Sequence, residues 1–182
     1  MPITLETLKK YRNKADVFVE TGTHVGHTVR MADSLGFKKI YTIELADHFY
    51  KKAVADFKSR PHIKPIFGDS AKEIPNVLKE LKDPAVFWLD GHWSDGDTAR
   101  GPVDVPLYQE LEAIAQHDIK THTILVDDTR LMGGEWKDVS VERVKELLLE
   151  INPNYKFTRE DGYLDPHRKT VKFPNDILVA SI

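Results

Sequence analysis

Short apolar runs alternate with amphipathic helical patterns along the first two thirds of the chain. The runs cover residues 15–20, 39–44, 63–68, 85–90 and 121–128. They are rich in β-branched and aromatic residues and bounded by Gly, Pro or Asp, as in strands covered on both faces. Between them, apolar residues recur three or four positions apart, which is typical of helices packed on a sheet. This alternation predicts right-handed crossovers and an α/β, doubly wound, mainly parallel sheet.

The last third of the sequence has a different pattern. Residues 155–159 and 176–181 predict two strands, and the polar stretch 160–175 between them shows no helical period. We therefore expect a seven-stranded sheet that ends in a C-terminal antiparallel hairpin. With 182 residues, 41% of them hydrophobic, the chain can bury one sizeable core, so we expect a single domain spanning residues 1–182.

Two local signals predict helix ends. Ser70 followed by Glu73 forms a capping-box pattern, which predicts a helix beginning at this point. Gly36 follows an apolar helical pattern and is predicted to end that helix.

Charge and composition limit the classes of partner. There are 29 acidic and 26 basic residues, and a net charge of -3 creates no general attraction for nucleic acid or anionic membranes. The absence of cysteine excludes disulfides, thiolate catalysis and cysteine zinc sites. No apolar run resembles a signal peptide or approaches the ~18 residues of a membrane span. We expect a cytoplasmic protein with a small-molecule partner, and the sequence leaves homo-oligomerisation open.

A glycine-containing loop follows the first predicted strand, in the segment ADVFVETGTHVGHT. The strand ends at Glu20, the loop contains Gly22 and Gly26, and a helical pattern follows. Open α/β sheets bind ligands beyond the carboxyl ends of their strands, where glycine lets the backbone come close. A second acid, Glu44, ends the next strand 24 residues later. Together these features suggest a ligand that contains a nucleoside.

The spacing of the loop argues against a dinucleotide. A pyrophosphate site requires G-x-G-x-x-G, whereas this loop has Gly22-x-x-x-Gly26 with His24 between the glycines. Four carboxylates end or follow the predicted strands: Glu20, Glu44, Asp69 and Asp90. They would repel a pyrophosphate but suit hydroxyl, ammonium and sulfonium groups, all of which S-adenosylmethionine carries.

These motifs resemble a known family. ETGTHVGH, YTIEL and FGDS are similar to segments of class I S-adenosylmethionine-dependent methyltransferases, over residues 15–128. With WLDGHW and ILVDD, the chain looks closest to the metal-dependent macrocin-type sugar O-methyltransferases, whose loop also lacks the middle glycine. The resemblance implies a Rossmann-like methyltransferase fold.

The resemblance also implies roles for residues of the loop and strand ends. Glu20 and Gly22 would border the methionine part of the cofactor, Glu44 would bind the ribose hydroxyls, and Asp69 with Ser70 would lie by the adenine. The remaining expected cofactor contacts are Thr21, Thr23, Gly26, Thr28 and Asp90.

Three aspartates are candidates for a metal site. The resemblance implies that Asp90, Asp127 and Asp128 bind a divalent ion, and the residues alone favour the same set because they end two neighbouring strands. Carboxylate ligands without cysteine favour Mg²⁺ or Mn²⁺. The alternative is that each aspartate only caps the turn that follows it.

His92 departs from the family pattern, which often has a second acid at this position. A histidine with a pKa of ~6.5 can accept a proton from a hydroxyl at neutral pH, so His92 is a candidate base beside Asp90. It could equally be a metal ligand or an ordinary loop histidine. The polar link 93–105 that follows, with Trp93 and Arg100, is a candidate binding loop.

We therefore expect an S-adenosylmethionine-dependent O-methyltransferase, assisted by a divalent metal, that acts on a hydroxyl of a sugar, diol or catechol-like molecule. Asp90 and His92 are its expected catalytic residues. Three alternatives remain open at this stage: a nicotinamide-dependent oxidoreductase, a metal-dependent hydrolase that uses Asp90, His92 and Asp127, and a non-catalytic protein that binds the same cofactor.

Overall fold

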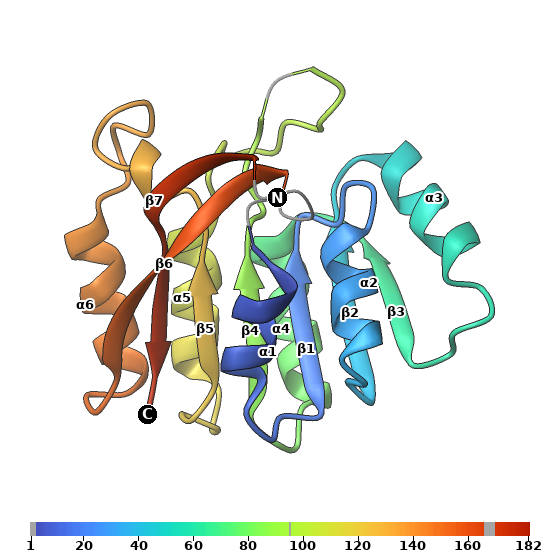
Figure 1. Ribbon diagram of the computed structural model, residues 1–182, viewed down its shortest axis with the longest axis horizontal. Helices are drawn as coiled ribbons and strands as arrows, with labels where there is room; N and C mark the ends of the chain where they lie inside the picture. Colours follow the sequence, from blue (N-terminus) through green and yellow to red (C-terminus); the bar gives the residue numbers. More distant parts are fainter. Residues whose placement is uncertain (1–2, 95, 166–169) are drawn as a thin grey trace.

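The computed structural model describes residues 3–94, 96–165 and 170–182. Within these ranges, seven strands form one sheet in the order β3-β2-β1-β4-β5-β7-β6, with β7 antiparallel to both neighbours (Figure 1). The strands are β1 Val17–Thr21, β2 Lys39–Glu44, β3 Ile63–Phe67, β4 Ala85–Leu89, β5 Thr123–Val126, β6 Lys156–Asp165 and β7 Thr170–Ser181. This sheet confirms the predicted doubly wound fold and its C-terminal antiparallel hairpin.

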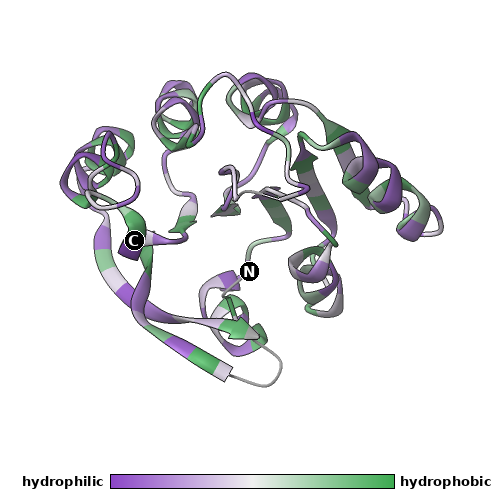
Figure 2. Ribbon diagram, turned by 90° about the horizontal axis from the view of Figure 1, so that it is seen from above, coloured by the Kyte–Doolittle hydropathy of each residue, from purple (hydrophilic) through white to green (hydrophobic). Residues whose placement is uncertain are grey.

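Helices cover both faces of the sheet (Figure 2). They are α1 Leu5–Arg12, α2 His27–Ser34, α3 Asp47–Asp56, α4 Ser70–Glu80, α5 Leu107–Gln116 and α6 Val141–Ile151, with a 3₁₀ turn, η1, at Thr129–Leu131. Among the described residues, no helix is both long and apolar enough to cross a lipid bilayer.

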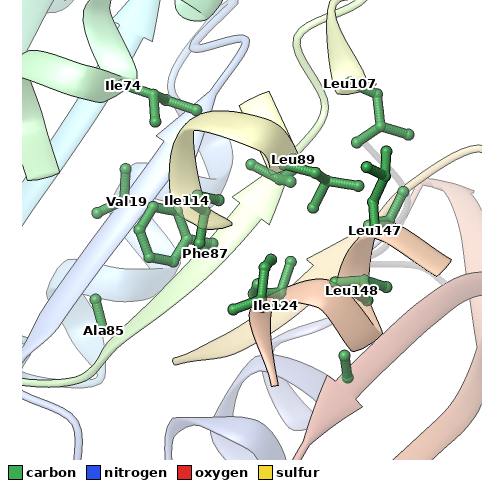
Figure 3. Close-up of a cluster of buried hydrophobic side chains, with 14 of the residues drawn as sticks. Val19, Ile74, Ala85, Phe87, Leu89, Leu107, Ile114, Ile124, Leu147 and Leu148 are labelled. Atoms are coloured by element: carbon green, nitrogen blue, oxygen red, sulfur yellow. The ribbon is translucent and has the colours of Figure 1, made fainter. Parts of the chain in front are cut away.

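The alternation of side chains along each strand divides the core into two layers. In β1, Phe18 belongs to the buried cluster that contains residues of α1, α2 and α3, whereas Val19 belongs to the cluster that contains residues of α4, α5 and α6. Figure 3 shows the second layer, in which Phe87 and Leu89 of β4 lie with side chains from the helices. Because both faces are covered, apolar side chains point to both sides of the central strands, as their sequences suggested.

The strand order places the carboxyl ends of the five parallel strands, β1 to β5, at one edge. β1 pairs with β2 on one side and with β4 on the other. The chain adds β2 and β3 on one side of β1 and then crosses to add β4 and β5 on the other, so the topological switch point lies between β1 and β4. Thr21 lies opposite Leu89, which lies opposite Val126. The residues that follow these three, Gly22, Asp90 and Asp127, therefore begin their loops side by side.

Two local expectations need correction. The hairpin strands reach Asp165 and begin again at Thr170, so much of the polar stretch 160–175 is strand; residues 166–169 lie outside the described residues. These parts of the strands were hard to predict because residues 160–175 are mostly polar and do not alternate between apolar and polar side chains. Asp69, not Ser70, is the N-cap of α4, and its side chain accepts the Ala71 amide at 3.1 Å. Gly36 does follow the end of α2, with a φ of 76°.

A buried histidine links β4 to the start of β5 and gives the fold a pH dependence. His122 is fully buried, its Nδ1 accepts the Ala85 amide at 3.0 Å, and its Nε2 lies 3.0 Å from His117 Nδ1. Burial, together with the nearby charges of His117 and Lys120, lowers the pKa of His122 to about 4.

We expect the free energy of unfolding to fall as the pH drops from ~6.5 towards 4, because the unfolded chain then binds a proton that the folded protein excludes. The loss attributable to His122 is at most about 3 kcal/mol. Urea unfolding between pH 4 and pH 7 should show a shallower pH slope in His122→Gln. His48→Gln, at a half-exposed side chain, serves as the control and should keep the original slope. Equal slopes in all three proteins would contradict this assignment.

Candidate functional site

A cavity of about 250 Å³ opens at the carboxyl edge of the sheet, where the loops after β1, β2, β3 and β4 meet. Seven of the candidate cofactor, metal and catalytic residues line it: Gly22, Glu44, Asp69, Ser70, Asp90, His92 and Asp128. The cavity lies where an open α/β sheet is expected to bind its ligand.

Two glycines allow the loops under this cavity to touch. Gly22 has a φ of +82°, and a Cβ built on it would lie 2.4 Å from the carbonyl oxygen of Asp90. A Cβ on Gly91 would lie 2.9 Å from both Glu110 Oε1 and Thr21 Oγ1. Any larger residue at either position would push the β1 and β4 loops apart.

Two backbone amides hold the Glu44 side chain at the cavity wall. Its Oε2 accepts the His24 amide and its Oε1 accepts the Ala46 amide, each at 2.7 Å. Each carboxylate oxygen keeps a further lone pair, so the two oxygens can still accept hydrogen bonds from a pair of adjacent hydroxyls. The backbone of His24 adopts a left-handed conformation, with a φ of 49°, in making this contact.

Other residues expected to contact a cofactor lie below the cavity. Glu20 is 1% exposed and its Oε2 accepts the Thr42 hydroxyl at 2.6 Å. Burial raises the pKa of Glu20 to about 8, although the bond from Thr42 opposes the shift. The structure therefore places a predominantly neutral acid beneath the loop at neutral pH. Its buried neighbours also shape the loop without lining the cavity: Thr21, Thr23, Thr28 and the α2 N-cap Gly26.

An imidazole joins the two acidic strand ends. His92 Nε2 lies 2.6 Å from Asp128 Oδ2 and 3.2 Å from Asp90 Oδ1. Burial alone would lower the pKa of His92, but the bonds to Asp128 and Asp90 outweigh it and raise the pKa to about 10. The same bond holds the pKa of Asp128 below its usual value despite burial. His92 is thus an imidazolium at neutral pH in this arrangement.

The predicted metal ligands form two groups that share Asp128. Donor atoms of Asp90, His92 and Asp128 all lie within 4.8 Å of one another, whereas Asp127 groups with Asp128 and Asp176. Asp127 is 2% exposed; its Oδ1 accepts the Asp128 amide at 2.7 Å, and its Oδ2 has no hydrogen-bond partner among the described residues. Burial and the charges of Asp90 and Asp128 raise the pKa of Asp127.

Sequence analysis missed an arginine that neutralises the second group. Arg130 Nη1 donates to Asp128 and to Asp176, a residue of β7 whose side chain is fully buried. The Arg130 amide also donates to Asp176 Oδ1 at 2.9 Å. The guanidinium therefore fastens Asp128 to the C-terminal hairpin.

Glu110 is a second residue that was missed. It lies on α5, is 1% exposed, and has an Oε1 without a hydrogen-bond partner among the described residues. Burial raises the pKa of Glu110 to about 7, against opposing bonds from Ser70 and Thr21. The sequence did carry a signal for this residue: Glu110 is an acid at helical spacing from Leu107 and Leu111, on the apolar stripe that predicts the buried face of the helix.

The polar link after His92 forms the outer wall of the cavity. The Trp93 amide donates to Asp104 O at 2.8 Å, and Arg100 binds both carboxylate oxygens of Asp104 at 2.7 and 2.8 Å. The guanidinium also lies over the Trp93 ring, 4.5 Å from its centroid. The guanidinium of Arg100 is thus paired with a carboxylate of its own loop.

We expect Gly22→Ala to destabilise the protein more than Gly36→Ala. Both glycines have a positive φ, so each substitution should cost about 1–2 kcal/mol of backbone strain. Only at position 22 does the new methyl also collide with backbone, since nothing lies within 4 Å of a Cβ at Gly36. Urea unfolding of the two variants measures the difference. Equal losses would show that the β1 and β4 loops are not in tight contact.

Comparisons with known proteins support the fold. No family model matches the chain, and no curated relative matches it. Solved structures do match. An O-methyltransferase from Bacillus cereus in complex with S-adenosylhomocysteine is 13% identical, with 98% of this chain and 78% of that chain covered and a TM-score of 0.63.

Two further structures of this kind differ in the activity named for them. The N-methyltransferase NodS from Bradyrhizobium japonicum, in complex with S-adenosylhomocysteine, is 13% identical, with 95% and 81% coverage and a TM-score of 0.56. An rRNA methylase from Streptococcus thermophilus is 15% identical, with 97% and 92% coverage and a TM-score of 0.53. At these identities the likeness establishes the fold: the chain has the Rossmann-like architecture of S-adenosylmethionine-dependent methyltransferases.

Proposed function

We propose that this chain is an S-adenosylmethionine-dependent O-methyltransferase that methylates a hydroxyl of a small molecule with the assistance of a divalent metal ion. The observation that carries the proposal is the cavity at the β1–β4 edge, which is lined by Gly22 and by Glu44, a carboxylate oriented by two backbone amides. An oriented carboxylate of this kind suits the two adjacent hydroxyls of a ribose.

The remaining walls suit the other parts of the cofactor. Asp69 and Ser70 line the cavity at the start of α4, where they can accept from an amino group of a purine. Asp90, at the end of β4, can attract an ammonium or a sulfonium group. Structures with the same fold, such as the O-methyltransferase from Bacillus cereus, contain S-adenosylhomocysteine, which supports this choice of ligand.

Methyl transfer needs alignment more than covalent catalysis. When bound, the cofactor would supply a methyl group activated by its sulfonium, and the acceptor hydroxyl would give up its proton in exchange for that methyl group. The protein must hold these atoms in line and accept the proton. His92 lies between Asp90 and Asp128 at the cavity wall, where it is placed for proton transfer.

The residues at the strand ends also fit a divalent ion. Asp90, His92 and Asp128 offer two carboxylates and an imidazole, and the unpartnered Asp127 Oδ2 lies in the adjoining group. Such a donor set suits Mn²⁺ or Mg²⁺. A bound ion supplies positive charge that favours the deprotonated acceptor oxygen.

This arrangement explains why a metal would be needed. With a pKa of about 10, His92 already holds a proton at neutral pH and is unable to take another. Positive charge from an ion on Asp90 and Asp128 would replace that of the imidazolium and leave a neutral imidazole, which can act as a base or ligand.

Glu44→Gln should weaken binding of S-adenosylmethionine roughly 10- to 100-fold, because the charged acceptor for two hydroxyls is lost. Isothermal titration calorimetry measures the change, and Glu112→Gln on the exposed surface of α5 is the matched control. Unchanged affinity in Glu44→Gln, with the fold intact by circular dichroism, would remove the assigned ribose site.

Asp128→Asn should reduce metal-stimulated methyl transfer by about tenfold or more, since even indirect partners of a metal site contribute this much. Asparagine tolerates the left-handed backbone of Asp128, with a φ of 54°, so the loop should fold normally. Transfer is measured with chelator and with added Mn²⁺ or Mg²⁺, and Asp118→Asn on an exposed loop is the control. Full metal stimulation in Asp128→Asn would refute the metal assignment.

A further inference from the structure

We propose that Glu110 is a positioning residue for the cofactor cavity: its buried carboxyl group fixes the Thr21 hydroxyl, which in turn fixes the backbone of Asp90. The inference rests on the proposed function, because binding of S-adenosylmethionine is what this arrangement prepares. It concerns a residue of α5 that does not line the cofactor cavity and takes no part in the methyl transfer described above.

Packing alone does not explain an acid at this position. Glu110 lies at helical spacing between Leu107 and Ile114, which belong to the buried core (Figure 3), and it is itself 1% exposed. Its Oε1 has no hydrogen-bond partner among the described residues. Burying a carboxyl group with an incomplete set of hydrogen bonds costs free energy, which an apolar side chain would avoid. We therefore infer that the acid serves the neighbouring site and not the core.

The carboxyl group of Glu110 meets two hydroxyls at the edge of the cavity. Burial raises the pKa of Glu110, and side-chain hydrogen bonds from Ser70 and Thr21 oppose the rise. Thr21 ends β1 and is fully buried, whereas Ser70 begins α4 and lines the cavity. One carboxyl group on α5 thus holds the ends of two elements that form the cavity.

The Thr21 hydroxyl passes this restraint on to the loop after β4. Thr21 Oγ1 accepts the Asp90 amide at 3.1 Å. A hydroxyl has one proton and two lone pairs, so donating that proton to Glu110 leaves a lone pair directed at the Asp90 amide. Without an acceptor at position 110, the hydroxyl would be free to rotate away from this geometry.

The backbone of Asp90 is held from its other side by Gly22. A Cβ at position 22 would lie 2.4 Å from the Asp90 carbonyl oxygen, so the two loops are in direct contact. Asp90 lines the cavity, where the proposed function assigns it to the positive charge of the cofactor. A shift of its backbone would displace this carboxylate, and a preorganised site binds more tightly than one that is ordered only on binding.

Glu110 also supports the same loop directly. A Cβ on Gly91 would lie 2.9 Å from Glu110 Oε1 and 2.9 Å from Thr21 Oγ1. Both oxygens therefore lie close against Gly91, and the loop after β4 rests on the acid of α5 as well as on the end of β1.

The test measures binding of S-adenosylmethionine by calorimetry. We expect Glu110→Leu to weaken binding about tenfold, the effect of one lost hydrogen bond in a preorganised site. Glu110→Gln keeps a carbonyl oxygen of the same reach, so its affinity should stay within about threefold. Glu112→Leu removes an exposed acid of the same helix and should leave the affinity unchanged. Equal affinities in Glu110→Leu and the unmodified protein overturn the inference.

A double-mutant cycle tests the route through Thr21. Thr21→Val removes the hydroxyl while keeping the shape of the side chain, and it should also weaken binding about tenfold. Because both residues act on Asp90 through one bond, the double variant Glu110→Leu/Thr21→Val should bind within about threefold of the weaker single variant. Losses that multiply to about a hundredfold overturn the route through Thr21 and the inference with it.

Urea unfolding of the same proteins separates this role from a structural one. If Glu110 only stabilised the fold, Glu110→Leu would lower the urea midpoint while the folded protein bound the cofactor with unchanged affinity, and the inference would be overturned. Should Glu110→Leu not fold, Thr21→Val and Thr21→Ser carry the test, since serine keeps the hydroxyl. The valine variant should then bind about tenfold more weakly than the serine variant, and equal affinities overturn the inference.

Calorimetry of the unmodified protein distinguishes the two possible failures. If S-adenosylmethionine binds and the variants bind it equally well, the role of Glu110 fails while the cofactor site stands. If S-adenosylmethionine does not bind to the unmodified protein, the proposed function fails and the inference fails with it.

Discussion

Compensation of buried negative charge is the constraint on which the carboxyl edge of this sheet depends. Asp90 and Asp128 follow adjacent strands, and keeping two such carboxylates charged in a largely buried place is costly without a cation. His92 supplies it by placing one ring nitrogen 2.6 and 3.2 Å from the two acids. Arg130 extends the same compensation to Asp176 of β7. One imidazole and one guanidinium thus join the ends of β4 and β5 to the middle of β7.

The fold was predictable because its signals are local. The run 39–44 coincides with β2, and the other central strands were located to within a few residues, since continuous apolar runs are typical of strands covered on both faces. The hairpin was predicted too short because the sequence of its outer half is mostly polar and carries no alternation of apolar and polar residues. At α4, Asp69 and Ser70 both had capping chemistry, and only the backbone geometry distinguishes them.

The candidate site was predictable where backbone topology determines position. Gly22, Glu44 and Asp90 lie at one edge because parallel strands end there, whichever side chains they carry. Side-chain direction was not predictable: Glu20 points into the core, below the cavity that it was expected to line. The contact of Arg130 with Asp176 joins residues 46 apart along the chain, and no local pattern indicates it.

The bond between Arg130 and Asp176 has a consequence for the order of folding. Asp176 belongs to β7, which inserts between β5 and β6, so the anchor of the Asp128 loop is synthesised long after the loop itself. Contacts between distant segments form late because closing the intervening chain costs entropy. The β1 to β4 half can therefore assemble first, while the acidic end of β5 acquires its final geometry only when β7 docks. The geometry of that end therefore depends on completion of the sheet.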